Sequence, residues 1–519
     1  MNISGDGLKR FRGSLYLNEP GEYDKILQVF CKKCNGGGVG MKKIAYIASE
    51  CVPFIKTGGL ADVVGTLPKK FDRNEYDVRI IMPNYMCLPE KYKSKMKYIT
   101  HFNMDIGWKQ QYVGVMYLEY EGVPVYFIDN EYYFNGFNIY GDVKWDIEKF
   151  CYFSKAALSI LPGIGFQPDI IHCHDWQSGM VPVYLKTLFA SNPFYSNMKS
   201  VMTIHNLQFQ GRWDIKTLQE FSGLPGYLFT PDKLEIDKDG SMLKGGLVYA
   251  DKISTVSNTY AQEIQTPYYG EGLDGLLRAR WQSLWGIVNG IDYQVWDPNT
   301  DPKIAKNYNI DNYRYDKVSN KLALQRELGL PEDPNAYMIG LVSRLTDQKG
   351  LDLIDRIMND IMTDGTQLIV LGTGDRRYED MFRYYQGIHP AKISANIYFS
   401  DDLSHRIYAS CDSMLVPSRF EPCGLTQLMA LRYGTLPIVR ETGGLKDTVI
   451  PYNEYEGTGT GFSFANYDAF DLLNTINYSK KVFFDDKDAW AGLQYRAMQQ
   501  NYSWDNSAKL YEQMYNELL

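Results

Sequence analysis

Residues 413–449 read "SMLVPSRFEPCGLTQLMALRYGTLPIVRETGGLKDTV" and contain two short apolar runs with a longer segment between them. The runs 413–418 and 436–441 are short and apolar, as expected for strands that are covered on both faces. Between them, residues 424–434 have the length and composition of a helix that ends at Gly434. A strand, a helix and a second strand in this order predict a βαβ unit and hence a parallel sheet.

The same alternation extends over most of the chain in two series, which begin at Met41 and near Ala336. The strand-like runs are 42–49, 77–82, 123–129, 168–174, 200–205 and 252–257 in the first series, and 336–343, 366–372, 395–400, 413–418 and 436–441 in the second. Apolar steps of three and four residues predict helices with buried faces, formed by Leu60, Val63, Val64 and Leu67 and by Leu353, Ile354, Ile357, Met358 and Ile361. We therefore expect an α/β fold with two doubly wound, Rossmann-like domains.

The domain boundary is expected within residues 286–302, where Gly and Pro cluster. This gives a first domain at 41–288, a second at 289–500 and a C-terminal helix at 501–519. Residues 1–40 are interpreted as an N-terminal extension that is disordered or not native, because a glycine-rich run precedes Met41, where an apolar strand begins abruptly. Open α/β sheets bind ligands at the carboxyl ends of their strands, so two facing domains predict an active cleft between them.

The composition excludes several classes of protein. With 54 basic and 62 acidic residues the formal net charge is −8, which argues against a nucleic-acid binder. No apolar run approaches the roughly 18 residues of a membrane span, and the first residues lack the apolar region of a signal peptide, so we expect a cytoplasmic protein. Among eight scattered cysteines only Cys31 and Cys34 form a C-x-x-C motif, and without further ligands nearby we expect no metal there.

Two loops that follow strands are candidate anion sites. Arg344 and Lys349 lie in a loop that enters a helix near Gly350, where positive side chains and a helix start favour an anion. Gly58 and Gly59 follow Lys56 and also precede a helix, so their amides can approach a ligand closely. The alternatives are solvated surface charges in the first loop and turn glycines without a ligand in the second.

Isolated polar residues at strand ends are weaker signals. His172, His174 and His205 lie where sheet ligands bind, yet a histidine there is more often a hydrogen-bonded core residue. Glu421 leaves a strand just before a helix, where a carboxylate can bind a sugar hydroxyl or stabilise positive charge at a reacting carbon. Taken alone, such a glutamate is more often a surface residue.

The motif Thr-Gly-Gly-Leu-x-Asp-x-Val occurs twice, beginning at Thr57 and at Thr442. Each copy is expected where a strand gives way to a helix, so glycine backbone from both copies is expected to approach the ligand. Lys56 precedes the first copy, whereas Glu441 precedes the second, so only the first brings a cation. Shared ancestry of two similar domains is an alternative explanation of the likeness.

Several motifs, in order and with the right spacing, carry a family resemblance. They are "KTGGLADVVG", "HCHDWQSGMVPVYLK", "TIHNLQFQG", "STVSNTYAQEI", "GIVNGID", "GLVSRLTDQKGLDLI" and "SRFEPCGLTQLMALRYGTLPIVRETGGLKDTV". From Met41 to its C-terminus the chain resembles bacterial glycogen synthase and plant starch synthase, retaining glucosyltransferases of the two-domain GT-B fold. The resemblance also implies that the C-terminal helix crosses back onto the first domain.

The resemblance implies transfer of glucose from ADP-glucose to the non-reducing end of an α-1,4-glucan such as glycogen, with retention. By motif position it implies the catalytic residues Lys56, His205, Arg344, Lys349 and Glu421. It further implies a nucleotide-sugar site of Lys56, Gly58, Gly59, Asn289, Arg344, Lys349, Phe399, Gly424, Thr426, Thr442, Gly443 and Gly444, and an acceptor side of Asp175 and Trp176. Cations and amides stabilise the departing diphosphate, so no metal and no other cofactor is expected.

One position departs from related families. Many retaining GT-B transferases have a second Glu eight residues after the first, but Met429 stands there, as in glycogen synthases of this class. The preference for ADP-glucose over UDP-glucose therefore rests on the resemblance alone. The alternatives are a sucrose- or trehalose-forming transferase, a glucan phosphorylase with pyridoxal phosphate, and a non-catalytic glucan-binding protein.

Overall fold

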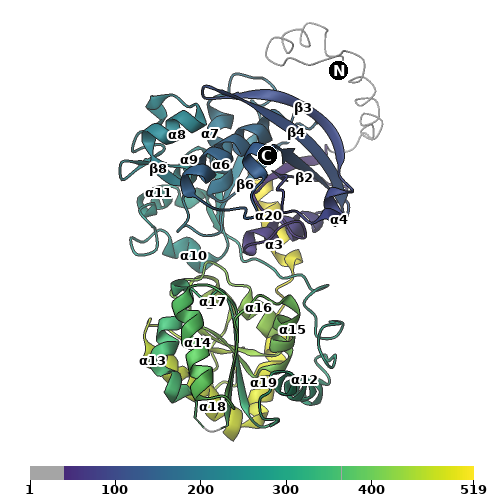
Figure 1. Ribbon diagram of the computed structural model, residues 1–519, viewed down its shortest axis with the longest axis vertical. Coiled ribbons are helices and arrows are strands. Elements are labelled where there is room, and N and C mark those ends of the chain that lie inside the picture. The colour runs from purple at the N-terminus through teal and green to yellow at the C-terminus, as the bar shows by residue number, and fades with distance from the viewer. Residues whose placement is uncertain (1–39, 364) are drawn as a thin grey trace. The chain divides into compact units, whose positions relative to one another are not determined.

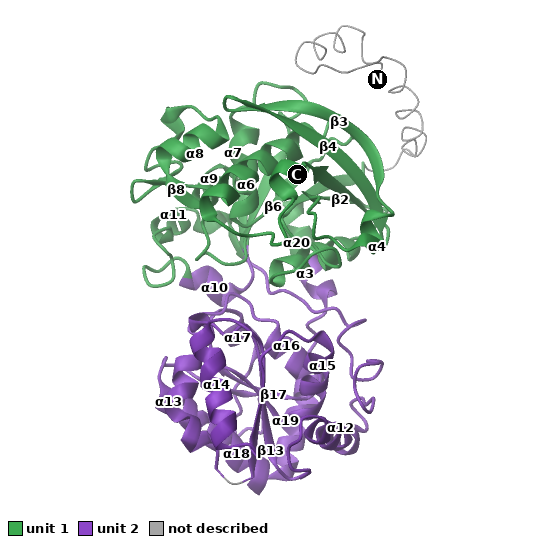
Figure 2. Ribbon diagram, viewed as in Figure 1, with its two compact units in different colours: residues 1–254, 264–285, 510–519 green, residues 255–263, 286–509 purple. Residues whose placement is uncertain are grey.

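The computed structural model describes residues 40–363 and 365–519. The chain divides into two compact units (Figure 2). Unit 1 comprises the described residues up to Ser254 together with Ile264–Trp285 and Leu510–Leu519, and unit 2 comprises Thr255–Glu263 and Gly286–Lys509. The expected extension at 1–40, apart from Gly40, and the Cys31–Cys34 motif lie outside the described residues. Thr255–Glu263 groups with unit 2, although the sequence places it in the first domain.

Unit 1 is built on a nine-stranded sheet in the order β12-β11-β7-β6-β1-β2-β5-β4-β3. Its strands are β1 (Lys42–Ile47), β2 (Tyr76–Pro83), β3 (Lys97–Ile106), β4 (Lys109–Tyr120), β5 (Val123–Asp129), β6 (Ile170–His174), β7 (Lys199–Ile204), β11 (Lys252–Thr255) and β12 (Leu284–Gly286). The chain moves outward from β1 through β2 to β5 and then returns to the other side of β1 at β6, and all these neighbours are parallel. The direction of progress therefore reverses between β1 and β6.

The antiparallel strands β3 and β4 extend this sheet and were not predicted. Most residues of β3 are partly or fully exposed, so the strand lacks the continuous apolar run that identified the central strands. A three-stranded sheet of β8 (Arg212–Asp214), β10 (Asp239–Ser241) and β9 (Glu235–Ile236) completes the strands of unit 1.

The helices of unit 1 include the one predicted after the first glycine pair. They are α3 (Gly59–Thr66), α4 (Glu90–Lys93), α5 (Glu131–Phe134), α6 (Val143–Ser159), α7 (Met180–Lys186), α8 (Ile215–Ser222), α9 (Met242–Tyr249) and α11 (Asp274–Ala279). The predicted face of α3 is confirmed, because Leu60, Val63, Val64 and Leu67 are all buried.

Helix α20 (Trp504–Asn516) begins in unit 2, and its last residues group with unit 1. The sequence pattern places Leu510, Met514, Tyr515 and Leu518 on one face of this helix; Met514 and Tyr515 are buried, but Leu510 is 40% exposed, so its place on that face was wrong. Tyr511 takes that place, and the Tyr515 hydroxyl lies 2.7 Å from His172 Nδ1. Tyr511 therefore fills the part of the buried face that the sequence pattern assigned to Leu510.

Unit 2 contains a six-stranded parallel sheet in the order β15-β14-β13-β16-β17-β18. Its strands are β13 (Tyr337–Val342), β14 (Thr366–Leu371), β15 (Ile393–Asn396), β16 (Ser413–Val416), β17 (Leu436–Arg440) and β18 (Phe462–Phe464). The order reverses between β13 and β16, as it does between β1 and β6 in unit 1. The strand predicted at 395–400 is wrong in position, because β15 ends at Asn396 and Phe399 lies in the following loop.

Helices cover both faces of this sheet. The helices of unit 2 are α10 (Asn258–Glu263), α12 (Tyr313–Glu327), α13 (Leu351–Ile361), α14 (Arg376–Ile388), α15 (Asp401–Ser410), α16 (Thr426–Arg432), α17 (Gly443–Thr448), α18 (Ala469–Asp485) and α19 (Lys487–Gln499). Figure 1 shows α13, α14 and α18 on one face and α12, α15 and α16 on the other. This doubly wound arrangement is the one predicted from the alternation of strands and helices.

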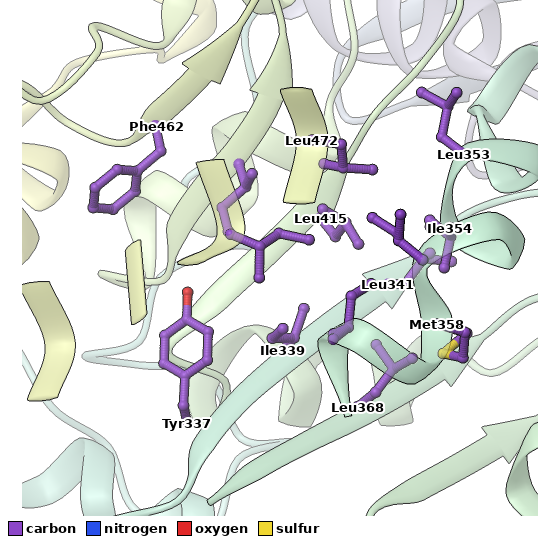
Figure 3. Packing of buried hydrophobic residues seen from close by; sticks show 14 of the residues in the cluster. Tyr337, Ile339, Leu341, Leu353, Ile354, Met358, Leu368, Leu415, Phe462 and Leu472 are labelled. Atoms are coloured by element: carbon purple, nitrogen blue, oxygen red, sulfur yellow. The ribbon is translucent and has the colours of Figure 1, made fainter. Parts of the chain in front are cut away.

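Alternate residues of β13 enter two separate apolar cores. Tyr337, Ile339 and Leu341 pack with Ile354 and Met358 of α13 in the first core (Figure 3). The neighbouring Met338 belongs to the second core, with Ile407 of α15. Because side chains alternate along a strand, each β-strand anchors helices on both faces, which fixes the loops at its end. The predicted buried face of α13 is confirmed in full.

Candidate active site

The loops that leave β13 and β16 lie at the reversal of strand order in unit 2, where open α/β sheets bind ligands. The two loops are bonded to each other, since the Arg419 amide donates to the carbonyl oxygen of Gln348 at 2.8 Å. Gly350 has a φ of +69°, and a Cβ atom there would overlap the carbonyl oxygen of Pro417. A glycine is therefore required for these two loops to approach each other.

Lys349 and Glu421 meet at this junction. Lys349 Nζ lies 2.6 Å from Glu421 Oε2, and Ser418 Oγ donates to the same oxygen at 2.8 Å. Glu421 is only 7% exposed, and burial of a carboxylate is costly unless it is paired and hydrogen-bonded. The two residues are 72 positions apart in sequence and are fixed in one geometry.

The other predicted residues of unit 2 lie on the same or neighbouring loops. Arg344 is exposed on the β13 loop and makes no ion pair with any residue that the structure describes. Gly424 has a φ of +74°, and the Thr426 hydroxyl donates to Val342 at the end of β13. Phe399 lies between β15 and α15 and is 87% exposed.

Asn289 is 4% exposed, and its side-chain oxygen has no hydrogen-bond partner among the described residues. The Asn289 backbone hydrogen-bonds to the thiol of Cys423, which lies two residues beyond Glu421. Burial raises the pKa of this thiol to about 12. Asn289 therefore adjoins the Glu421 loop, and its amide oxygen is available to a ligand.

The second Thr-Gly-Gly loop is buried in unit 2. The Thr442 hydroxyl donates to Glu263 Oε1 at 2.9 Å, and the Gly443 amide lies 3.1 Å from both oxygens of that carboxylate. The Gly444 amide donates to the carbonyl oxygens of Glu421 and Pro422, each at 3.1 Å. Both glycine amides are thus already hydrogen-bonded inside the unit, and the predicted donor contact of Thr442, Gly443 and Gly444 stays a prediction.

The first Thr-Gly-Gly loop of unit 1 is mostly exposed and follows β1. Lys56 is 47% exposed and lies 2.8 Å from Asp62 in α3. Gly58 has an extended backbone with φ −155°, and a Cβ atom added there would meet no described atom within 4 Å. Neither backbone conformation nor packing requires Gly58 to be a glycine, which leaves room for the close approach of a ligand.

Glu50 supports this loop and was not predicted as a site residue. Its carboxylate, 3% exposed, accepts a hydrogen bond from the Thr57 amide and one from the Thr57 hydroxyl at 2.7 Å. The Tyr140 hydroxyl donates to Glu50 Oε1 at 2.5 Å. The available signal was a carboxylate three residues after an apolar strand, and only the fold identifies its partners.

The predicted residues of β6 and β7 form a second cluster in unit 1. Asp175 Oδ1 accepts a hydrogen bond from the His205 amide at 2.7 Å, and His205 Nε2 lies 3.0 Å from His174 Nδ1. Burial raises the pKa of Asp175 to about 7 and lowers the pKa of His205 to about 3. Trp176 follows Asp175 and packs against Phe150 with 5.2 Å between ring centroids.

His172 and His174 are fully buried on β6. His172 is hydrogen-bonded to Thr203 and Tyr515, which confirms the interpretation of a core histidine. Burial lowers the pKa of His172 to about 3 and holds the pKa of His174 well below its usual value. Both rings are therefore neutral near pH 7, and His174 supports His205 by a hydrogen bond without charge.

Two family models match the chain. The model of the starch synthase catalytic domain matches residues 43–279, and that of glycosyl transferases group 1 matches residues 323–481. A glycogen synthase from Lachnospira eligens is 59% identical over 478 residues, which cover 92% of this chain and 100% of the relative. One from Clostridium kluyveri is 50% identical over 477 residues, again covering 92% of this chain and 100% of the relative.

Solved structures are similar in fold as well. The catalytic domain of starch synthase IV from Arabidopsis thaliana, bound to ADP and acarbose, has a TM-score of 0.85 at 32% identity, with 92% of this chain and 99% of that chain covered. Sucrose-phosphate synthase from Thermosynechococcus elongatus has a TM-score of 0.58 at 18% identity over 92% of this chain and 99% of that chain, which is a likeness of fold alone. Across the described residues, every helix is too short or too polar to cross a membrane.

Proposed function

Because the chain belongs to the glycogen and starch synthase family of glycosyltransferases, we propose that it transfers glucose from ADP-glucose to the non-reducing end of an α-1,4-glucan. The observation that carries the proposal is the Lys349–Glu421 pair, which joins the β13 and β16 loops at the reversal of strand order. ADP as the nucleotide is supported by the Arabidopsis thaliana relative, whose solved structure contains ADP and acarbose.

In this proposal the cations of the site stabilise the leaving diphosphate. Arg344 is exposed and without an ion pair among described residues, so its guanidinium is available to a phosphate. Lys349 serves both the phosphate and Glu421, since its ammonium has three donors. Charge grows on the diphosphate as the glycosidic bond breaks, so fixed cations bind the transition state more strongly than the ground state.

Glu421 is proposed to bind hydroxyl groups of the donor glucose. Its carboxylate is fixed on one oxygen by Lys349 and Ser418, which holds the group in one orientation. In unit 1, His205 is proposed to contact the same sugar, and Asp175 and Trp176 are proposed to contact the acceptor. The neutral imidazole of His205 can donate or accept a hydrogen bond without adding charge to the reacting carbon.

The proposed reaction proceeds on one face of the sugar. The bond between the anomeric carbon and the diphosphate oxygen breaks, and a bond from the acceptor hydroxyl to that carbon forms on the same face. The proton of the acceptor hydroxyl passes to an oxygen of the leaving phosphate. No side chain of the protein needs to act as nucleophile, and the configuration is retained.

The decisive experiment incubates the purified protein with glycogen and either ADP-glucose or UDP-glucose. We expect release of ADP together with new α-1,4 linkages, and slower release from UDP-glucose. Release from neither donor contradicts the proposal, and faster release from UDP-glucose contradicts the assigned nucleotide. Because side-chain cations serve the diphosphate, addition of EDTA is expected to leave the rate unchanged.

A further inference from the structure

A short segment of unit 2 that follows β11 is bonded to the rest of that unit by three side chains. Ser257 Oγ donates to the carbonyl oxygen of Pro422 at 2.6 Å. The Thr259 hydroxyl and amide donate to the carboxylate of Asp447 at 2.5 and 3.0 Å. Glu263, the last residue of α10, accepts the hydrogen bonds from Thr442 and Gly443. We call residues 257–263 the anchor segment.

The anchor segment supports the backbone around Glu421 through the second Thr-Gly-Gly loop. Glu263 holds Gly443, and the next amide, that of Gly444, donates to the carbonyl oxygens of Glu421 and Pro422. A Cβ atom on Gly443 would overlap the Glu421 carbonyl oxygen, and one on Gly444 would overlap that of Cys423. The glycines therefore allow the loop to lie directly against the backbone of Glu421–Cys423.

Glu421 is thus held from two directions. Lys349 and Ser418 fix its carboxylate, whereas Gly444 and Ser257 fix the carbonyl groups of Glu421 and Pro422. Displacement of a reacting or substrate-binding group by about 1 Å can lower a rate about 100-fold. A shift of this backbone would move the Glu421 carboxylate with it.

A carboxylate at position 263 suits this task. Its two oxygens accept from one hydroxyl and one amide, and hydrogen bonds to a charged group are stronger than those between neutral groups. Asp447 plays the same part for Thr259 in the last turn of α17. The Glu263 contact holds the Thr442–Gly444 loop and the Asp447 contact holds α17, and neither requires a ligand.

We propose that Glu263, assisted by Ser257 and Thr259, is a positioning residue that fixes Glu421 for glucosyl transfer through the Thr442–Gly444 loop. The proposal deepens the function stated above and rests on it for its kinetic test. It gives the second Thr-Gly-Gly copy a role in supporting the Glu421 backbone.

The test compares Glu263→Gln with Gln262→Ala, a change at an exposed neighbour on the same helix. With ADP-glucose and glycogen, Glu263→Gln is expected to lower kcat about ten-fold or more, the effect of losing one hydrogen bond to a charged group, with the KM for ADP-glucose changed less than about two-fold. Gln262→Ala is expected to behave as the unchanged protein. An unchanged kcat in Glu263→Gln, or a fall that only follows the loss of folded protein, overturns the proposal.

Conservative rescue separates positioning from general stability. Thr259→Val removes the hydroxyl and is expected to lower kcat about three-fold or more, whereas Thr259→Ser keeps it and is expected to restore the rate. Equal rates for the valine and serine variants contradict the role of this hydroxyl.

Hydrogen exchange tests the same inference without activity. In Glu263→Gln, amides within 442–446 and 420–425 are expected to exchange about ten-fold faster than in the unchanged protein, because the loop has lost its carboxylate. Unaltered exchange overturns the positioning role. Failure of the unchanged protein to use either donor contradicts the proposed function, while the exchange result still decides the role of Glu263.

Discussion

The two Thr-Gly-Gly-Leu loops carry the same residues in opposite surroundings. In the first, Thr57 and Gly59 are exposed and Gly58 has open space around it. In the second, Thr442 is fully buried and both glycines lie against the Glu421 backbone. Each threonine nevertheless donates its hydroxyl to a glutamate, Glu50 in unit 1 and Glu263 in unit 2. In both copies of the motif the threonine hydroxyl is thus fixed by a glutamate. The glycines differ, because those of the second copy pack against the backbone of Glu421–Cys423, whereas Gly58 of the first has open space around it.

The positions of the loops in their sheets also differ. The first follows β1, at the reversal of strand order in unit 1, whereas the second follows β17, one strand beyond the reversal in unit 2. The counterpart of the first loop in unit 2 is the loop after β13, which carries Arg344 and Lys349. The two copies of the motif therefore do not occupy equivalent positions in the two sheets. This disfavours shared ancestry of two similar domains as the explanation of the repeat.

The largest expected difference is in stability, between variants of Lys349 in unit 2 and Lys56 in unit 1. Lys349→Ala and Lys56→Ala are each expected to lower kcat about 100-fold or more, as removal of a transition-state contact does. Lys349→Ala should in addition lower the free energy of unfolding by about 3–5 kcal/mol, because it leaves Glu421 buried without its partner. Lys56→Ala breaks a partly exposed pair, which contributes less than about 1 kcal/mol.

Kinetics and thermal unfolding of the two variants check this contrast. Lys446→Ala, at an exposed position within the second motif, is the matched control and is expected to change neither quantity. Equal losses of stability in Lys349→Ala and Lys56→Ala would contradict the difference in burial.

The glycines give the next contrast. Gly443→Ala is expected to destabilise unit 2 by about 1–3 kcal/mol, because the new methyl group overlaps the Glu421 carbonyl oxygen and the backbone has a φ of +45°. Gly58→Ala is expected to change stability by less than about 0.5 kcal/mol and to weaken ADP binding. The midpoints of thermal unfolding and calorimetric titration with ADP measure both effects, and a stable Gly443→Ala variant would refute the packing argument.

Acidification is expected to lower the stability of unit 1 around β6. The pKa of His172 is lowered to about 3 from an ordinary value near 6.5, so its contribution to stability is present above about pH 6.5 and is lost as the pH falls toward 3. The slope is up to about 1.4 kcal/mol per pH unit for each such histidine. Asp175, with its pKa raised to about 7, acts in the opposite sense and offsets one histidine between about pH 4 and 6.5.

Hydrogen exchange of residues 170–175 and 442–449 at pH 7 and pH 5 measures this difference. We expect faster opening at pH 5 in the first region, after correction for the intrinsic rate, and little change in the second. Equal changes in both regions would contradict the assignment of the effect to the buried histidines.

The smallest contrast concerns the threonine hydroxyls. Thr442→Val leaves Glu263 with one donor fewer in a buried site and is expected to cost about 1 kcal/mol, measured as a lower unfolding midpoint. Thr57→Val removes the corresponding bond to Glu50, which keeps its hydrogen bonds from the Thr57 amide and the Tyr140 hydroxyl, and is expected to cost less. A larger loss in Thr57→Val than in Thr442→Val would reverse the comparison.

Most of the fold was predictable because the central strands are buried on both faces and therefore appear as continuous apolar runs. Strands β3 and β4 lack such runs and were missed, and Leu510 of α20 was misplaced because Tyr511 takes its place on the buried face. The family motifs identified Lys349 and Glu421 individually, but only the parallel sheet brings these residues together. Glu263 lies inside a recognised motif and received no role, because its partners are 179 and 180 positions away.

The most direct test of the account measures amide exchange at 56–60 and 442–446, in the free protein and with saturating ADP. The account predicts fast exchange at 56–60 that ADP slows, apart from the Thr57 amide, which donates to Glu50, because the rest of this loop is open to a phosphate. It predicts slow exchange at 442–446 in both conditions, because Glu263 and the Glu421 backbone already occupy these amides. Fast exchange at 442–446 that ADP slows as much as at 56–60 would contradict the account.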